Sequence, residues 1–409
     1  MQPRRLAERQ LELDQQRTAR FPALLARKQA RMSASPLSFL RGAAPLFYEM
    51  LAADPELANG PAGEGVIQGD AHLENFGAFS PGVEEAGSWH KGHATFHLND
   101  FDEATRGAWR WDVLRLTTSL LLAGRELGQS GPAVLGLCEA LLDSHSDALF
   151  AAARLPPLPP PVAALIMKVD GRANKRLLEE RTTTSGGVRR FVRGERYADV
   201  SPAVTAAVPA ALKLFAERTA ARGGPRPEQL ELLDVAFRIA GTGSLGSLRV
   251  AALTRGKGGG DACWLFDLKE QAGSSVDVLA MRPPVASRAQ EVESAFRVCV
   301  EQPPRMLGTS SLAGTDVLVR RLTPQEDKLS LTRLEAGQLP ELSRYLGALL
   351  GAAHRRGKSA EFPAWTARER GGILERAVTL AGIHEAVYLE LCWRSRAAKP
   401  EPEEPVIPG

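Results

Sequence analysis

The sequence predicts an α+β protein of two lobes, in which a mostly helical lobe comes first and an antiparallel-sheet lobe comes second. Apolar residues recur at helical spacing over much of residues 1–155, whereas short runs of alternating apolar and polar residues dominate residues 231–335. The proline-rich stretch "LPPLPPPV" cannot continue a helix and separates the two patterns. Helical spacing returns in residues 336–400.

In the first lobe, two helical patterns enclose two short strands. "SPLSFLRGAAPLFYEMLAADP" starts with a serine and a proline suited to a helix N-terminus, and "WRWDVLRLTTSLLLAGREL" is apolar almost all round, which predicts a buried helix. Between them, "GVIQGD" and "ATFHLND" have the pattern of strands. Asp70 is therefore expected where a strand ends and a loop begins, a common position for functional groups.

These patterns divide the chain at the proline-rich stretch and again around the sheet. We expect a helical lobe in 1–155, a connector with a basic segment in 156–230, a sheet lobe with one helix in 231–335, C-terminal helices packing on the helical lobe in 336–400, and a disordered tail in 401–409. The basic segment is interpreted as a solvated face, with contact to a phosphate or another anionic substrate as the alternative.

The composition excludes several classes of protein. The chain has 409 residues, 44% of them hydrophobic and 24% charged, as in an ordinary globular protein. Its net charge of +3 is too small for a dedicated nucleic-acid binder. The four cysteines form no C-x-x-C pair, and no apolar run reaches the length of a membrane span. We therefore expect a cytoplasmic protein without nucleic-acid or membrane partners, and the oligomeric state stays open.

The second lobe contains a glycine-rich turn between two expected strands. The G-x-G-x-x-G spacing is supplied by Gly241, Gly243 and Gly246 in "GTGSLG". A dinucleotide-binding fingerprint would need a helix after it, but "SLRVAALT" has the pattern of a strand. A glycine turn between antiparallel strands is typical of the kinase phosphate loop, which requires a lysine on the third strand. Lys269 in "LFDLKE" meets this requirement, and its glutamate partner on the next helix could be Glu291 or Glu293.

Carboxylates and one amide are concentrated in the first lobe. Asp70 and Asn75 in "DAHLEN" have the D-x-x-x-x-N spacing of the kinase catalytic aspartate and its metal-binding asparagine. Asp100 in "LNDFDEA" is followed by Phe101, as in the kinase D-F-G, with Asp102 in the place of the glycine. These residue types suit phosphoryl transfer, because Mg²⁺ prefers oxygen ligands and the reacting hydroxyl needs an oriented acceptor.

"GDAHLENFG", "LNDFDEA" and "WDVLRL" resemble the catalytic loop, metal loop and following helix of the aminoglycoside-phosphotransferase branch of the protein-kinase-like superfamily. Together with "SPLSFLRGAA", "GTGSLG" and "LFDLKE", they resemble a bacterial family, domain-of-unknown-function family 2252. The resemblance implies an ATP- and Mg²⁺-dependent phosphotransferase acting on a hydroxyl of an unknown small molecule. Asp70 would deprotonate the hydroxyl, Asn75 and Asp100 would hold Mg²⁺, Lys269 would bind the phosphates, and Gly241, Gly243 and Gly246 would cover them.

The order of these motifs differs from that of ordinary kinases. Kinases have the glycine loop and lysine first, whereas here Asp70 precedes Gly241. A circular permutation would explain the difference, and "YLGALLGAAHRRG" resembles the helix that leads into the catalytic loop in ordinary members. Asp112 resembles the aspartate that supports the backbone of the catalytic loop. Arg41 could bind a phosphate or an acidic partner such as Asp100.

Three other functions remain open on the sequence. "GDAH" together with His90, His93, His97 and Asp100 could form a two-metal phosphoesterase site, although Gly241 to Lys269 would then have no role. A kinase-like fold could also bind nucleotide without turnover, or transfer AMP in place of phosphate.

Overall fold

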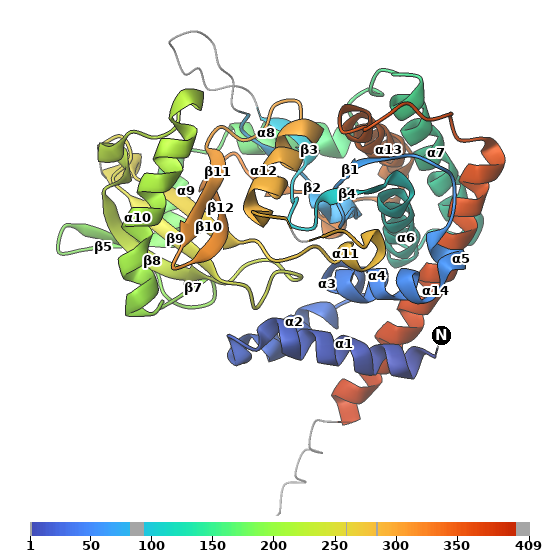
Figure 1. The fold of residues 1–409 in the computed structure, drawn as a ribbon, viewed down its shortest axis with the longest axis horizontal. Coiled ribbons are helices and arrows are strands. Elements are labelled where there is room, and N and C mark those ends of the chain that lie inside the picture. Colours follow the sequence, from blue (N-terminus) through green and yellow to red (C-terminus); the bar gives the residue numbers. More distant parts are fainter. Residues whose placement is uncertain (1, 82–93, 259, 284, 398–409) are drawn as a thin grey trace, which may run out of the picture.

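The computed structural model describes residues 2–81, 94–258, 260–283 and 285–397, with side chains described up to residue 394. In Figure 1, a six-stranded sheet with helices α10 and α12 lies on the left, and a helical region with α6, α7, α13 and α14 lies on the right. Helices make up 54% of the structure, and the α+β class predicted from the sequence is confirmed. The predicted tail, 401–409, lies outside the described residues.

The chain begins with three helices that we call the N-terminal arm: α1 (Pro3–Thr18), α2 (Leu25–Met32) and α3 (Pro36–Gly42). The serine of the predicted helix start does cap α3, since the Ser35 side chain accepts a hydrogen bond from the Ser38 N–H at 3.1 Å. Two short helices follow, α4 (Ala44–Ala53) and α5 (Pro55–Ala58).

The first lobe then forms two small antiparallel sheets and two long helices. Its elements are β1 (Glu64–Ile67), β2 (Phe76–Phe79), β3 (Thr95–Leu98), β4 (Thr105–Ala108), α6 (Trp109–Glu126) and α7 (Gly131–Phe150). β1 pairs with β4, and β2 pairs with β3. As the apolar pattern predicted, α6 is buried along nearly its whole length. The strands carry the two loops that contain Asp70 and Asp100.

The expected connector is built from regular elements. After the prolines come α8 (Pro160–Asp170), α9 (Asn174–Arg181), the hairpin β5 (Thr182–Ser185) and β6 (Val188–Phe191), β7 (Tyr197–Ala198) and α10 (Pro202–Thr219). β7 is an edge strand of the large sheet, and α10 packs against β11 in that sheet. The basic segment is partly paired, because Lys168 and Arg172 bind the Asp327 carboxylate at 2.9 and 2.6 Å. The stretch is divided between the lobes, because α8 packs on β2 and β3 of the first lobe, whereas β7 and α10 belong to the large sheet.

The large sheet is antiparallel throughout, with strand order β11-β12-β10-β9-β8-β7. Its further strands are β8 (Leu232–Arg238), β9 (Arg249–Thr254), β10 (Trp264–Glu270), β11 (Leu307–Leu312) and β12 (Thr315–Leu322), and α11 (Asp277–Ala280) and α12 (Arg288–Cys299) lie between β10 and β11. The predicted glycine hairpin is thus β8 and β9, and Lys269 lies on the next strand. α12 packs on β11 and β12.

The chain returns from the sheet to the helical region. β13 (Asp327–Lys328) pairs with β2, and α13 (Leu339–Arg356) packs along α7. The two helices approach closely because Gly347 and Gly351 have no side chains; a Cβ atom at either position would lie 2.3 Å from an α7 carbonyl oxygen. α14 (Ala367–Ala397) covers α6 and reaches α1, so both ends of the described chain lie together (Figure 1).

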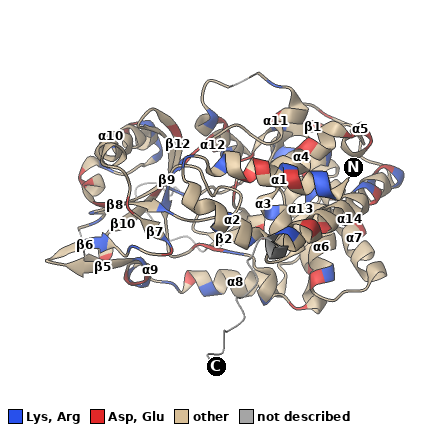
Figure 2. Ribbon diagram, turned by 90° about the horizontal axis from the view of Figure 1, so that it is seen from below, with Lys and Arg blue, Asp and Glu red and all other residues tan. Residues whose placement is uncertain are grey.

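Basic and acidic residues are distributed over both lobes in the ribbon of Figure 2, and both kinds occur along α1. In the part of the chain that the structure describes, no helix combines the length and the apolar character that crossing a membrane requires.

Candidate functional site

The turn that carries Asp70 is fixed by a buried carboxylate. The turn follows β1, and its Gly69 has a φ of +78°, where a Cβ atom would lie 2.1 Å from the Glu103 carbonyl oxygen. Asp112, on the first turn of α6 and 0% exposed, accepts hydrogen bonds from the backbone N–H groups of Gln68 at 2.6 Å and of Gly69 at 2.8 Å. These contacts show that Asp112 supports the backbone of the loop that leads to Asp70, as the sequence predicted.

A second helix also reaches this carboxylate. His354 of α13 places Nε2 3.1 Å from the Asp112 Oδ2 atom. At the end of the same helix, the Gly357 carbonyl oxygen accepts a hydrogen bond from the Val66 N–H at 2.9 Å. Contacts from both α6 and α13 therefore hold the turn before Asp70 in place, although the two helices are far apart in the sequence.

Asp70 itself is paired with a buried arginine. The Arg115 Nε atom donates to Asp70 Oδ1 at 2.7 Å, and Arg115 Nη2 donates to the Leu40 carbonyl oxygen at 2.9 Å. Burial raises the pKa of Asp70 to about 6, because desolvation outweighs the attraction of Arg115 and the nearby Glu103 adds repulsion. Sequence reasoning missed Arg115; the available signal was its position three residues after Asp112 on one face of an apolar helix.

Asn75 and His72 complete the Asp70 loop. Asn75 Nδ2 donates to the Asp70 carbonyl oxygen at 2.9 Å, which leaves Oδ1 to face the Lys328 ammonium at 3.5 Å. His72 Nε2 lies 3.7 Å from Asp70 Oδ2. Burial and the nearby Arg41 lower the pKa of His72 well below its usual value, so this ring is neutral at pH 7.

Lys269 reaches the aspartates of the first lobe from the sheet. Its ammonium lies 3.6 Å from Asp100 Oδ1 and forms an ion pair with Asp102. Lys328 lies 3.7 Å from Asp100 Oδ2. Burial would raise the pKa of Asp100, but the two ammonium groups hold it below its usual value. Burial lowers the pKa of Lys269 to about 8, against the attraction of Asp100.

Two expected ion pairs take other partners. Neither glutamate of α12 pairs with Lys269, because Glu291 binds Arg282 and Arg288 and Glu293 binds Arg222 and Arg297. Asp102 provides the carboxylate that was expected from α12. Arg41 pairs with Glu74, not with Asp100.

The three glycines of the turn between β8 and β9 have different surroundings. Gly241 and Gly243 line the cavity that contains Asp70. Gly246 packs against α1 instead, where a Cβ atom would lie 2.1 Å from the Arg17 carbonyl oxygen. The lack of a side chain at Gly246 is thus required by the N-terminal arm, and the structure does not bring this residue to the site with the other two.

A buried lysine fastens the arm to the glycine turn. Lys28 is 2% exposed, and its ammonium lies 3.3 Å from the Thr242 carbonyl oxygen, 3.5 Å from that of Gly243 and 3.5 Å from the Asp14 carboxylate. Nothing in the sequence distinguished this lysine from a surface residue. The contact joins residues more than 200 positions apart.

Replacing Lys28 with methionine is therefore expected to loosen the glycine turn. Methionine keeps the length of the side chain but removes the donors to both carbonyl oxygens. We expect faster hydrogen exchange in residues 241–246 than in the wild type, measured by mass spectrometry at neutral pH. Lys257→Met, at an exposed lysine of the turn between β9 and β10, serves as the control. Unchanged exchange in both variants would contradict this role of Lys28.

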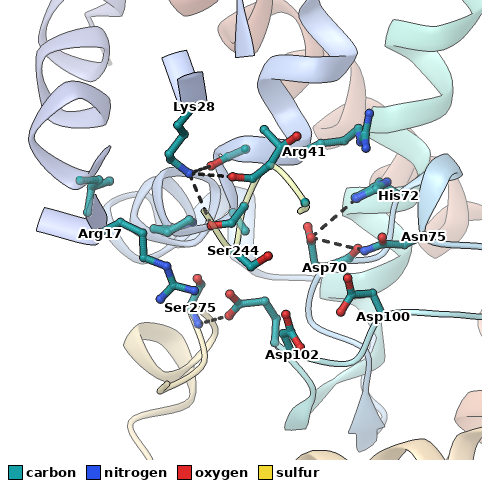
Figure 3. A pocket seen from close by; sticks show the side chains of 18 of the residues that line it. Arg17, Lys28, Arg41, Asp70, His72, Asn75, Asp100, Asp102, Ser244 and Ser275 are labelled. Atoms are coloured by element: carbon teal, nitrogen blue, oxygen red, sulfur yellow. Dashed lines mark hydrogen bonds and ion pairs between the residues drawn. The ribbon is translucent and has the colours of Figure 1, made fainter. Parts of the chain in front are cut away.

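The site consists of two adjoining cavities. A smaller one of about 100 Å³, the Asp70 cavity, lies between the Asp70 loop, the glycine turn and the N-terminal arm (Figure 3). A larger one of about 360 Å³, the Lys269 cavity, is lined by side chains of β8, β9, β10 and β12 and by the Asp100 loop. Both are lined by Arg41, Asp100, Asp102, Gly241 and Lys328. Cationic side chains outnumber carboxylates in the walls of the Lys269 cavity, which suits an anionic ligand. The seven cations are Arg41, Arg181, Arg238, Arg249, Lys269, Arg320 and Lys328, and the five carboxylates are Asp100, Asp102, Asp267, Glu326 and Asp327.

The chemistry of the oxygen donors fits Mg²⁺. The described residues contain no group of three or more His, Cys, Asp or Glu side chains placed to hold a metal. Mg²⁺, however, needs only one or two protein carboxylates when phosphates and water supply the other ligands. Asn75 and Asp100 provide such oxygens, and the Lys328 ammonium lies within 3.5 to 3.7 Å of both. The oxygens of Asn75 and Asp100 therefore already face one positive charge, that of Lys328.

Of the three histidines His90, His93 and His97, the structure describes only His97, and it does not bring His97 to the aspartates. His97 lies on β3 with its Nε2 2.9 Å from Arg356 Nη2, and it lines neither cavity. Burial and Arg356 lower its pKa to about 3. His90 and His93 lie outside the described residues. Of the histidines in this alternative that the structure describes, His72 lies beside Asp70 and His97 lies away from the site.

Comparison with known proteins identifies a family. Neither the curated proteins nor the solved structures contain a match to the chain. A family model described as an uncharacterized protein conserved in bacteria matches residues 20–391. This range includes every residue that lines the Lys269 cavity, and it includes the Asp70 cavity except for the wall that α1 contributes. The chain therefore belongs to domain-of-unknown-function family 2252.

Proposed function

We propose that the protein is an ATP- and Mg²⁺-dependent phosphotransferase of the kinase-like superfamily that acts on a hydroxyl of a small molecule. One observation carries the proposal: the Lys269 ammonium, from the sheet lobe, lies 3.6 Å from the Asp100 carboxylate, from the helical lobe. A nucleotide bound in the Lys269 cavity would have its phosphates between these two groups, with Asp70 in the adjoining cavity.

A circularly permuted kinase-like fold is part of the proposal. The sheet lobe follows the kinase order, with a glycine turn between β8 and β9, Lys269 on β10 and helix α12 next. α13 then ends beside β1, where the Gly357 carbonyl oxygen and the Val66 N–H are 2.9 Å apart. A chain that continued from Gly357 into β1 would restore the ordinary order of the motifs, and this proximity supports the permutation.

The proposed reaction assigns one task to each side chain. Asp70 accepts the proton of the acceptor hydroxyl as its oxygen bonds to the γ-phosphorus, and the bond from the γ-phosphorus to the bridging oxygen breaks, so ADP leaves. Lys269 binds the phosphates through its charge. Asn75 and Asp100 would hold Mg²⁺, which neutralises charge on the phosphates when bound. Arg115 keeps the Asp70 carboxylate oriented and ionised near neutral pH.

The proposal is tested by a thermal-shift titration with ATP, with and without Mg²⁺. A ligand at 100 times its Kd stabilises the folded state by about 2.7 kcal/mol, so a Mg²⁺-dependent rise of the midpoint is expected. Asp100→Asn and Lys269→Met are expected to lose the rise, whereas Lys257→Met, the exposed control, keeps it. If both site variants respond like the wild type, the nucleotide site is elsewhere and the proposal fails.

The products then distinguish phosphoryl transfer from AMP transfer. Phosphoryl transfer releases ADP, whereas AMP transfer releases pyrophosphate. We expect ADP and no pyrophosphate, measured by phosphorus NMR of the wild-type reaction. Mg²⁺-dependent binding with neither product would identify a nucleotide-binding protein without turnover.

A further inference from the structure

One wall of the Asp70 cavity is built by the N-terminal arm. Helix α1 contributes Arg17, and α2 contributes Lys28 (Figure 3). This wall is fixed in place, because Gly246 lies against the Arg17 backbone and Lys28 holds two carbonyl oxygens of the glycine turn. The backbone at Arg17 is therefore fixed against the glycine turn, and the Arg17 side chain extends toward Ser275 (Figure 3).

The charges of this cavity are almost completely paired. Asp14 pairs with Lys28, Arg41 with Glu74, Asp70 with Arg115, Asp102 with Lys269, and Asp100 with Lys269 and Lys328. Glu103 accepts a hydrogen bond from the Ser275 N–H at 2.5 Å. Arg17 is the exception among the cations: within the described ranges it has neither an ion pair nor a side-chain hydrogen bond. Since a guanidinium stays charged, this half-buried group is available to an anion.

Arg17 lies on the Asp70 side of the site, where the acceptor hydroxyl would meet the γ-phosphate. Arg17 lines the Asp70 cavity and does not line the larger Lys269 cavity. The smaller cavity, about 100 Å³, contains the carboxylate that would take the proton from the acceptor hydroxyl. Any group that reaches Arg17 inside this cavity is therefore close to the reacting hydroxyl in the same molecule.

We propose that the acceptor is a small hydroxy compound with an anionic group, a carboxylate or a phosphate, which binds the Arg17 guanidinium while the hydroxyl faces Asp70. The planar fork of arginine matches the two oxygens of either anion. A cationic acceptor would be repelled by the positive charge of Arg17. The inference rests on the proposed function and adds to it the charge class of the substrate.

The test compares small hydroxy compounds that differ in charge. The probes are sn-glycerol 3-phosphate and D-glycerate (anionic), glycerol (neutral) and choline (cationic). Each is added to the full-length protein with Mg²⁺ and adenylyl imidodiphosphate, and also without nucleotide, and the thermal midpoint is measured. We expect at least one anionic probe to raise the midpoint, and glycerol and choline to leave it unchanged.

Variants then assign the response to Arg17. Arg17→Met is expected to weaken the apparent affinity for the anionic probe at least about tenfold and to leave the response to adenylyl imidodiphosphate unchanged. Arg17→Lys, which keeps the charge but not the fork, is expected to retain part of the response. Arg5→Met removes the same charge from an exposed position on the same helix and is expected to behave like the wild type.

Several results would overturn the inference. The first two concern the wild type: a rise of the thermal midpoint with choline or glycerol in place of the anions, or no rise with either anion. The other two concern Arg17→Met: an undiminished rise with the anion, or a loss of nucleotide binding while the rise with the anion is kept. Failure of the proposed function looks different. In that case ATP and Mg²⁺ do not shift the wild type, while the measurement without nucleotide still reports which charge the Asp70 cavity prefers.

Discussion

Asp70→Asn is expected to lower the rate of ADP release by about 10²- to 10⁴-fold, the usual contribution of general base catalysis. Asparagine has nearly the same shape but cannot accept the proton of the attacking hydroxyl. Binding of ATP with Mg²⁺ should persist, because Lys269, Asn75 and Asp100, which would hold the phosphates and Mg²⁺, are unchanged in this variant. The variant is therefore assayed both for ADP release and for the thermal shift with ATP.

The control is Asp143→Asn, at an exposed aspartate on α7 that pairs with Arg370. It removes the same charge at a position outside both cavities and should keep the wild-type rate. Wild-type ADP release from Asp70→Asn would contradict the assignment of Asp70 as the base. Loss of both nucleotide binding and folded structure would instead reflect the unpaired Arg115, which the thermal midpoint of the variant reveals.

The dependence of the rate on pH checks the same assignment without a mutation. The base must be ionised, and the pKa of Asp70 is raised to about 6, so the rate should fall as the pH drops below about 6. Lys269 must be protonated to hold phosphate, and its pKa is lowered to about 8, so the rate should fall again above about 8. The bell-shaped profile is expected for kcat/KM of the wild type. A rate that stays level from pH 5 to 9 would contradict both roles.

The sequence was sufficient for elements whose signal is local. The buried helix α6, the hairpin of β8 and β9 and the strand with Lys269 follow from apolar spacing and turn residues within about twenty positions. The Asp70 loop and the Asp100 loop were also predicted, because kinase-type chemistry needs fixed residue types at short spacing. That these loops and Lys269 share one site remained a hypothesis, since no local pattern reports a distance between lobes.

The missed residues are those whose partners are distant in the sequence. Lys28 contacts a turn that follows it by more than 200 residues. The sequence does not distinguish a buried lysine such as Lys28 from an exposed one. Arg115 looked like a polar interruption of an apolar helix. The glutamates of α12 were favoured by kinase analogy, but arginines close to them are better partners. Charge pairing depends on packing, which the sequence pattern does not encode.

The glycine motif is a second case in which the sequence pattern did not predict a contact with a distant residue. Three glycines at G-x-G-x-x-G spacing were expected to have one role, yet only Gly241 and Gly243 line the Asp70 cavity. Gly246 has a φ of +104° and lies against the backbone of α1. The spacing predicts where the chain needs glycine. It does not predict whether the space is taken by a ligand or by another helix.

Asp112→Ala is expected to cause the largest loss of stability among the site variants. Asp112 is 0% exposed and accepts hydrogen bonds from the N–H groups of Gln68 and Gly69, which would be left without acceptors. Breaking a buried charged network of this kind costs about 3–5 kcal/mol. The free energy of unfolding is measured by urea denaturation, with the midpoint compared at constant m-value.

Asp143→Ala provides the matched comparison. This aspartate is 59% exposed in its side chain and forms an ion pair with Arg370 at the surface, so its loss should cost less than about 1 kcal/mol. A cost for Asp112→Ala no greater than that of Asp143→Ala would contradict the structural role of Asp112. Asp112→Asn, which retains one acceptor oxygen and the size of the side chain, should lie between the two.

The expected loss is large because the Asp112 carboxylate joins elements from opposite ends of the chain. β1 and α6 meet there through Gln68, Gly69 and Asp112, and α13 joins them through His354. Under the permutation that we propose, an unpermuted chain would run from α13 directly into β1, and the chain itself would hold the turn. In this protein that covalent link is absent between Gly357 and β1, so hydrogen bonds to Asp112 and Val66 must hold the Asp70 turn in its place. Asp112→Ala should therefore lower ADP release as well as stability, by allowing Asp70 to move away from Arg115.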